Sequence, residues 1–309
     1  MINNKLPALC IDFLGKKLKN PVVSASGCFS YGLEQRSLLP PSLFGAITLK
    51  GLSARPKKGN PPVRIVETSC GLLNSIGLEN IGIEAFMKAI WPSLRALETP
   101  IIVNFFGDDE EEFLLAADML NELDDILALE LNLSCPNKPA WGKILASDPL
   151  VTGRLVRLVK RVTRHPLIVK LSPNVTSITD IAKSAEDNGA DAISLINTLQ
   201  GMVIDVERRT SKLGSLFGGL SGPSIRPVAL RMVYEVVRVV SVPVIGVGGI
   251  MNHEDALSFF IVGAKVVEVG TLLFVNPKGV EEIIQGISIY LARHHMRSID
   301  SLIGSMVDA

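Results

Sequence analysis

Short apolar runs recur along the chain, and stretches of helical length with one apolar side lie between most of them. The runs occupy residues 21–25, 46–50, 101–104, 128–133, 167–171, 192–196, 243–247 and 266–269. The amphipathic stretches include 110–123, 148–164, 178–188, 223–239 and 253–262. Buried strands that alternate with helices are typical of a parallel sheet covered by helices. Eight such strands predict an α/β fold, a (β/α)8 (TIM) barrel.

The pattern adds four features to the eight repeats. Residues 6–18 predict an N-terminal hairpin that turns at Gly15-Lys16, and residues 277–309 predict a terminal helical pair. Two long loops, 51–84 after strand 2 and 198–222 after strand 6, follow carboxyl ends of strands, where barrels build active sites. Connections this long are usually functional. Because no linker divides the chain, we expect a single domain over residues 1–309.

An open, doubly wound sheet is the alternative architecture. Such a sheet would carry a GxGxxG turn for a dinucleotide after its first strand. The chain instead reads SASGCFSYG at residues 24–32. The barrel is therefore the better prediction.

Composition narrows the class of protein. The 309 residues include 31 basic and 31 acidic side chains, so a net charge of zero gives no footprint for nucleic acid or anionic lipid. Cys10, Cys28, Cys70 and Cys135 form no CxxC pair, which argues against a zinc, iron–sulfur or disulfide framework. With neither a signal-like N-terminus nor an apolar run of about 20 residues, we expect a cytoplasmic protein.

Polar side chains stand where the predicted strands end. Lys50 ends the second strand, Asn104 the third, Asn132 the fourth and Lys170 the fifth, and Asn197 follows the sixth. A barrel places strand ends on one rim. A single lysine at such a place usually extends to solvent. Two lysines and three asparagines together favour a binding site.

Glycine turns follow the last two strands. Gly248-Gly249 comes after the seventh and Gly270-Thr271 after the eighth, and GGLSGPSIRP at 218–227 adds another turn before a helix. Backbone N–H groups at such turns bind anions, helped by a helix N-terminus. The loops after strands 7 and 8 are the usual phosphate site of barrels. One glycine pair is weak evidence, since glycine also forms plain turns; together the turns predict a phosphate-bearing ligand.

The stretch ALELNLSCPNK at 128–138 brings a thiol to a strand end. A thiol between Asn132 and Asn137 suits proton transfer beside a planar polar ligand, although a buried structural cysteine explains this stretch equally well by itself. The loop GLLNSIGLEN at 71–80 adds Asn74 and Asn80. These are either turn residues or members of a ring of amides around a flat heterocycle.

Five motifs together resemble the dihydroorotate dehydrogenase family over residues 6–309: NLSCPN, Lys50-Gly51, NSIGLEN, GGLSGPSIRP and VIGVGGI. The resemblance is closest to the class 1B catalytic subunits, which carry a cysteine base. It implies an FMN cofactor held by Ser26, Lys50, Gly51, Asn104, Asn132, Lys170, Ile196, Gly222, Gly248, Gly249, Gly270 and Thr271. It implies dihydroorotate held by Lys50, Asn74, Ser75, Ile76, Gly77, Leu78, Asn132, Asn197 and Thr198. Cys135 would be the catalytic base.

The implied reaction, a step of pyrimidine biosynthesis, suits these residue types. Oxidation of dihydroorotate to orotate removes a proton from C5 and a hydride from C6, and the hydride goes to flavin N5. Cys135 would take the proton, and a thiol pKa of about 8.5 would make activity rise with pH. Ser134 is a rival base with a far less acidic hydroxyl. Lys170 would stabilise negative charge near flavin N1, and Lys50 would bind the substrate carboxylate.

The resemblance also implies a partner. Class 1B chains form a homodimer that joins an electron-transfer subunit holding FAD and a [2Fe–2S] cluster, a heterotetramer that reduces NAD⁺. This chain lacks the motifs for those groups, so the partner would supply them. A class 1A homodimer that uses fumarate, and a reductase related to dihydropyrimidine dehydrogenase, are the near alternatives.

Two hypotheses from other classes remain. A lyase could use Lys170 as a Schiff-base nucleophile on a phosphorylated sugar, which would leave Cys135 and the asparagines without a role. A barrel that only binds a nucleotide would need no thiol on a loop. Neither would bind flavin.

Overall fold

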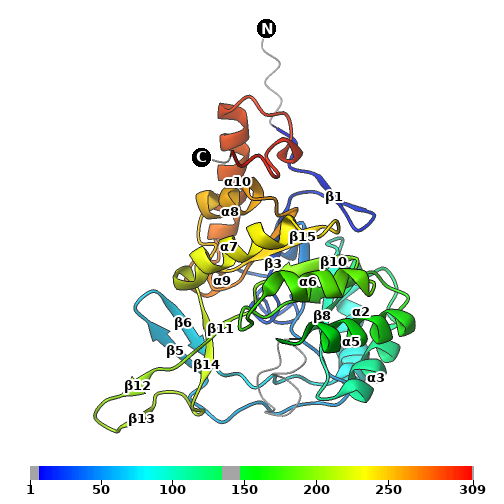
Figure 1. The fold of residues 1–309 in the computed structure, drawn as a ribbon, viewed down its shortest axis with the longest axis vertical. Helices are drawn as coiled ribbons and strands as arrows, with labels where there is room; N and C mark the ends of the chain where they lie inside the picture. Colours follow the sequence, from blue (N-terminus) through cyan, green and yellow to red (C-terminus); the bar gives the residue numbers. More distant parts are fainter. Residues whose placement is uncertain (1–6, 134–146, 308–309) are drawn as a thin grey trace.

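The computed structural model describes residues 7–133 and 147–307 and shows a closed barrel of eight parallel strands (Figure 1). In order around the barrel, the strands are β3 (Val22–Ser24), β4 (Ala46–Thr48), β7 (Ile101–Phe105), β8 (Ala128–Asn132), β9 (Leu167–Lys170), β10 (Ala192–Leu195), β15 (Val244–Val247) and β16 (Val266–Val269). β16 pairs with β3 and closes the barrel. The predicted runs are these strands, so the (β/α)8 barrel is confirmed and the open sheet is wrong.

Helices surround the barrel. They are α1 (Ile83–Ala89), α2 (Trp91–Leu94), α3 (Glu110–Leu120), α5 (Pro149–Val162), α6 (Ile178–Asp187), α7 (Arg226–Val237), α8 (His253–Ile261), α9 (Leu272–Val275) and α10 (Gly279–Arg293). The side chains of Asp109, Asp148, Ser177 and Asn252 accept hydrogen bonds from first-turn N–H groups of α3, α5, α6 and α8. These caps satisfy N–H groups that have no partner inside the helix, and so fix where each helix begins.

The barrel strands are buried along their whole length, as expected for a parallel sheet covered on both faces. Most of their side chains are Val, Ile, Leu or Ala, which form the core. The exceptions are polar and lie on seven different strands: Ser24, Thr48, Asn104, Glu130, Asn132, Lys170, Ser194 and Glu268. Polar groups at such depth need partners, and those partners define the candidate site described below.

The two long connections form a sheet of their own, which extends from one end of the barrel (Figure 1). This insert sheet has the order β11 (Leu199–Gly201), β14 (Gly218–Ser221), β6 (Gly71–Asn74) and β5 (Ile65–Thr68). β6 and β14, from the two different connections, pair antiparallel with Leu73 opposite Leu220. The tip of the second connection is a small hairpin of β12 (Ile204–Asp205) and β13 (Thr210–Ser211).

The first and the last described segments of the chain are in contact. The predicted N-terminal hairpin is present as β1 (Ile11–Phe13) and β2 (Lys16–Leu18), although its turn is at Leu14-Gly15, one residue earlier than predicted. The predicted terminal helical pair is wrong in its second member: α10 is followed by a 3₁₀ turn, η3 (Ile299–Ser301), whose Ile299 N–H donates to Ala8 O. Among the described helices, none is long and apolar enough to cross a membrane.

Candidate active site

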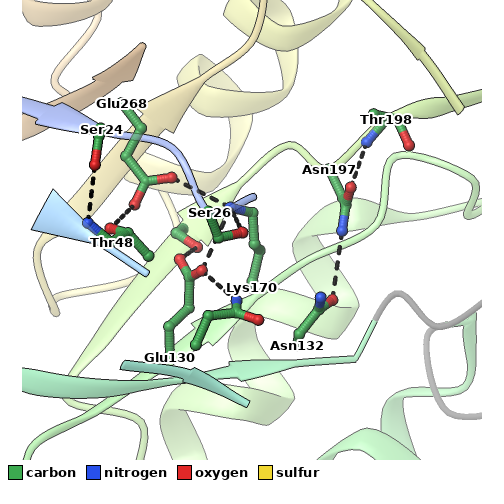
Figure 2. Close-up of polar contacts among 11 residues, drawn as sticks. Ser24, Ser26, Thr48, Glu130, Asn132, Lys170, Asn197, Thr198 and Glu268 are labelled. Atoms are coloured by element: carbon green, nitrogen blue, oxygen red, sulfur yellow. Dashed lines mark hydrogen bonds and ion pairs between the residues drawn. The ribbon is translucent and has the colours of Figure 1, made fainter. Parts of the chain in front are cut away.

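A buried charge cluster of Glu130, Lys170 and Glu268 lies inside the barrel (Figure 2). The Nζ atom of Lys170, at the carboxyl end of β9, is 3.2 Å from Oε2 of Glu268 on β16. The same atom is 3.4 Å from Oε1 of Glu130 on β8 and 3.4 Å from Oγ of Ser26, which follows β3. Three strands and one strand-end loop thus position the ammonium group.

The two carboxylates of the cluster have further donors. Glu130 accepts from Asn104 Nδ2 at 2.6 Å and from Ser194 Oγ at 2.8 Å. Glu268 accepts from Thr48 Oγ1 at 2.9 Å. Buried ionised groups are tolerated only when they are paired and hydrogen-bonded, which these partners achieve. The arrangement therefore holds Lys170 rigidly at the rim.

Burial and the neighbouring charges alter the acid–base properties of the cluster. Burial alone would lower the pKa of Lys170, but the charges of Glu130 and Glu268 outweigh it and raise that pKa above its usual value. Burial, with repulsion from Glu130, raises the pKa of Glu268 to about 7 against the attraction of Lys170. Lys170 is therefore a cation at neutral pH. A Schiff-base lyase needs the neutral amine, so this environment argues against one.

Two of the expected rim amides are brought together. Asn197 Nδ2 donates to Asn132 Oδ1 at 3.4 Å, and Asn197 Oδ1 accepts from the Thr198 N–H at 2.7 Å. Asn132 is paired in register with Lys170 on the adjacent strand, so both face the same end of the barrel. Asn174 reinforces this rim, because its Nδ2 donates to Thr198 O at 3.0 Å.

The loop expected to hold substrate is braced by its own hydrogen bonds. Asn74 Nδ2 donates to Gly219 O of β14 at 3.1 Å, and Ser75 Oγ accepts from Asn60 Nδ2 at 2.7 Å. Ile76 O accepts from the N–H of Asn60, while Gly77 and Leu78 have positive φ angles of 74° and 56°. Residues 74–78 are thus held as a fixed turn beside the insert sheet.

Asn80, which the sequence offered as a ring amide or a turn residue, is the turn residue. Its Oδ1 accepts from the N–H groups of Ser53 and Gly82, and its Nδ2 donates to Ser53 Oγ at 2.9 Å. The side chain is buried within the connection. Its amide group therefore stabilises the loop, and the ring-amide interpretation of Asn80 is wrong.

The expected phosphate turns meet at one point. A Cβ on Gly249 (φ 72°) would lie 2.7 Å from Gly222 O, and one on Gly222 (φ 90°) would lie 2.9 Å from Gly71 Cα. Thr271 Oγ1 donates to Ser221 Oγ at 2.9 Å, beside Gly222. Only glycine permits such close backbone approach at positive φ. The turns after β14, β15 and β16 thus form a cradle of backbone, which suits an anion.

The remaining expected cofactor residues adjoin the cradle and the cluster. A Cβ on Gly248 would lie 3.4 Å from Ile196 Cγ1, and one on Gly270 would lie 3.2 Å from the Sγ of Cys28. Lys50 lies two residues beyond β4, where its N–H donates to Ser30 O. Rim, cradle and cluster therefore occupy the same end of the barrel.

One buried acceptor at this end indicates a ligand. Asn104 Oδ1 has no hydrogen-bond partner among the residues that the structure describes. A Cβ on Gly51 would lie only 2.6 Å from this oxygen, so glycine leaves it accessible from that side. Buried acceptors without a partner are rare in native proteins. An orphaned acceptor, a cationic Lys170 and a backbone cradle together fit a flat heterocycle that carries a phosphate.

The expected base lies outside the described residues. Ser134, Cys135 and Asn137 fall within 134–146, and the last described residue of this stretch is the buried Leu133. The role of Cys135 stays a prediction.

The residues that the sequence analysis missed are the carboxylates and hydroxyls inside the barrel. Glu130 precedes Asn132 by two positions and therefore shares its face of β8. Glu130 interrupts the apolar run of β8, and Glu268 likewise interrupts the apolar run VVEV of β16. A charged residue within a strand buried on both faces is itself a signal, since such residues almost always have a partner.

The sequence of the chain is similar to those of known proteins. The model of the family described as dihydroorotate dehydrogenase matches residues 8–291. A relative from Thermodesulfovibrio yellowstonii, named "Dihydroorotate dehydrogenase B (NAD(+)), catalytic subunit", is 49% identical over 97% of this chain and 99% of its own length. Relatives of the same name from Geotalea uraniireducens and Caldicellulosiruptor bescii are each 48% identical, over 97% and 96% of this chain and 99% and 98% of their own lengths.

Proposed function

The chain belongs to the dihydroorotate dehydrogenase family of oxidoreductases, and from that premise we propose that it oxidises dihydroorotate to orotate with bound FMN. The observation that carries the proposal is the Lys170 ammonium group, which two buried carboxylates hold at the carboxyl end of the barrel beside a backbone cradle. Such a cation stabilises negative charge on an adjacent ring, which is the electrostatic demand of this reaction. The reaction would serve pyrimidine biosynthesis.

FMN would supply the hydride acceptor. Gly222, Gly248, Gly249, Gly270 and Thr271 would hold its phosphate group. Ser26, Lys50, Gly51, Asn104, Asn132, Lys170 and Ile196 would line its ring system, and the orphaned Asn104 Oδ1 would gain a donor there.

The substrate would lie between the ring and the loop of the first long connection. Lys50 would bind the carboxylate of dihydroorotate, and Asn132 and Asn197 would hydrogen-bond its amide groups. Thr198 and residues 74–78 (Asn74, Ser75, Ile76, Gly77 and Leu78) would complete the pocket. The hydrogen bonds that brace this loop and the rim amides fix these groups before substrate arrives, which reduces the entropy lost on binding.

Cys135 would act as the base at C5. Its thiolate would accept the proton while the hydride leaves C6, so that both hydrogens depart and the C5–C6 double bond of orotate forms. Only the ionised thiol can accept a proton, so the rate of flavin reduction should rise with pH.

We further propose that the electrons reach NAD⁺ through a partner subunit that holds FAD and a [2Fe–2S] cluster, around a homodimer of this chain in the cytoplasm. The support is the relatives' name, which specifies both a catalytic subunit and NAD⁺. A fumarate-using homodimer remains the alternative, and the choice of oxidant by the purified complex decides between them.

The visible spectrum of the purified chain tests the proposal, followed by anaerobic addition of dihydroorotate. A flavin spectrum that bleaches supports both cofactor and substrate. A flavin spectrum that stays oxidised would contradict the substrate and move the proposal to another pyrimidine. No flavin, even after incubation with FMN, would contradict the proposal altogether.

A further inference from the structure

Glu268 has no role in the reaction proposed above, yet it contacts the group on which that reaction depends. Its carboxylate is fully buried in the barrel, where Oε1 accepts from Thr48 Oγ1 at 2.9 Å and Oε2 lies 3.2 Å from Lys170 Nζ (Figure 2). Glu268 belongs to β16, whereas Glu130 belongs to β8, the strand that pairs with β9. The cation is therefore shared between two carboxylates.

The charges around Glu268 do not balance when every group is ionised. One ammonium group, that of Lys170, faces two carboxylates, those of Glu130 and Glu268. The thiol of Cys28 also faces the cluster, but burial raises its pKa to about 11, so it is neutral. The cluster therefore carries one excess negative charge in a buried site, where uncompensated charge is costly.

A single proton removes this excess, and Glu268 is the better acceptor. Glu130 is stabilised by two neutral donors, Asn104 and Ser194, in addition to Lys170. Glu268 has one neutral donor, Thr48, in addition to Lys170. Burial and repulsion from Glu130 hold the pKa of Glu268 near 7, within the working range of a cytoplasmic enzyme.

We propose that Glu268 is a positioning residue that takes up a proton when the flavin beside Lys170 is reduced, and so couples the reduction potential of the flavin to pH. This inference rests on the proposed function, because it requires the flavin ring next to the ammonium group of Lys170.

The step balances in atoms and charge. The hydride from dihydroorotate delivers two electrons and one proton to the ring, which gains one negative charge near Lys170. This charge competes with Glu268 for the ammonium group and makes its carboxylate more basic. Glu268 then takes a proton from solvent and forms an O–H bond, so that the total charge of the ring and the cluster is unchanged. On reoxidation Glu268 releases that proton.

The test is the midpoint potential of the bound flavin as a function of pH, measured on the holoenzyme by dithionite titration between pH 6 and pH 9. For a two-electron couple each proton taken up lowers the potential by about 30 mV per pH unit. In the wild type, we expect the midpoint potential to fall by about 30 mV per pH unit below the pKa of Glu268 and by about 60 mV per pH unit above it. Glu268→Gln keeps the shape of the side chain but cannot titrate. Its midpoint potential should therefore fall by about 30 mV per pH unit throughout the range.

Two further variants sharpen the test. Thr48→Val removes the hydrogen bond that stabilises ionised Glu268, so the break in slope should move to higher pH. Glu235→Gln, which neutralises a carboxylate paired with Arg231 on the outer helix α7, should keep the wild-type profile. If Glu268→Gln fails to retain flavin, the direction of the shift in Thr48→Val decides the question.

A wild-type potential that changes with one slope across the range would overturn the inference, as would a break that persists in Glu268→Gln. If the protein binds flavin that dihydroorotate bleaches but shows one of these results, only the inference fails. If the wild type binds no flavin, the proposed function fails and the inference falls with it.

Discussion

The polar side chains inside the barrel are arranged around the ammonium group of Lys170. An isolated charge at that depth would be prohibitive, so two carboxylates accompany it, and each carboxylate brings hydroxyl or amide donors from a further strand. Five strands and Ser26, two residues beyond β3, thus contribute one polar side chain each to a network around Nζ of Lys170. The arrangement makes the stability of the protein depend on pH through Glu268.

Glu268→Gln should change how the stability of the flavin-free protein varies with pH. The pKa of Glu268 is raised from 4.5 to about 7 on folding, so the folded state holds its proton more tightly than the unfolded state. The stabilisation from this proton is complete below pH 4.5 and is lost as pH rises to about 7. We expect the melting temperature of the wild type to fall over this window and that of the variant to fall less. Identical profiles in differential scanning calorimetry would contradict the assignment.

Cys135→Ala should keep the flavin spectrum but slow flavin reduction by dihydroorotate, on the scale of about 10²- to 10⁴-fold for loss of a general base. Stopped-flow absorbance under anaerobic conditions measures this rate. Cys10→Ala, at an exposed thiol beside the N-terminal hairpin, serves as the control and should reduce at the wild-type rate. Reduction near the wild-type rate in Cys135→Ala would remove the thiol from the reaction.

Sequence patterns revealed some of these residues and concealed others. Lys170 and Asn132 stood out because they end apolar runs, and the structure places both at the carboxyl end of the barrel. Glu130 and Glu268 lie inside such runs, where the hydrophobic pattern identifies the strand and hides the exception. Their pairing with Lys170 depends on closure of the barrel, which brings together positions separated by 40 and 98 residues.

At the scale of elements, the turns after β14, β15 and β16 together form the backbone cradle, which no single turn could form. The turns after β14 and β15 contribute glycines with positive φ angles, and the turn after β16 contributes the Thr271 hydroxyl, which donates to Ser221 Oγ. The periodicity of the sequence predicted the barrel strands because burial on both faces leaves a continuous apolar run. It did not predict the insert sheet, because β6 and β14 are short, half-exposed and rich in glycine, and because they pair across 145 residues.

Gly249→Ala should weaken FMN binding strongly. The added Cβ would meet Gly222 O at 2.7 Å, at a φ of 72° that is unfavourable for alanine, and so would displace the cradle. We expect the dissociation constant for FMN to rise at least about tenfold, which corresponds to about 1.4 kcal/mol. Quenching of FMN fluorescence on binding to the apoprotein measures it.

Gly189→Ala is the matched control for this change. Gly189 also has a positive φ, 105°, but its added Cβ would meet only the flexible side chain of Lys160, in the turn before β10 at the other end of the barrel. This variant should lose some stability and keep its affinity for FMN. If Gly249→Ala and Gly189→Ala lost the same affinity for FMN, general destabilisation rather than the cradle would explain the loss.

At the scale of the whole molecule, the barrel carries the candidate site at one end, and the proposed function sends the electrons on to NAD⁺ through a partner subunit. We expect the chain alone to reduce an artificial dye with dihydroorotate but not NAD⁺. Addition of a subunit that holds FAD and a [2Fe–2S] cluster should make NADH appear, followed at 340 nm. Formation of NADH by the chain alone would contradict the proposed partner.

The pairing of β6 with β14 has a consequence for how the site responds to its ligand. Because the two long connections share one sheet, neither can shift without straining the backbone hydrogen bonds of the other. Deuterium uptake by the amides of β6 and β14 should therefore slow in concert when substrate binds, even if it contacts only one of them. Substitutions at Leu73 and Leu220 should likewise be non-additive, so natural variation in one connection is constrained by the other.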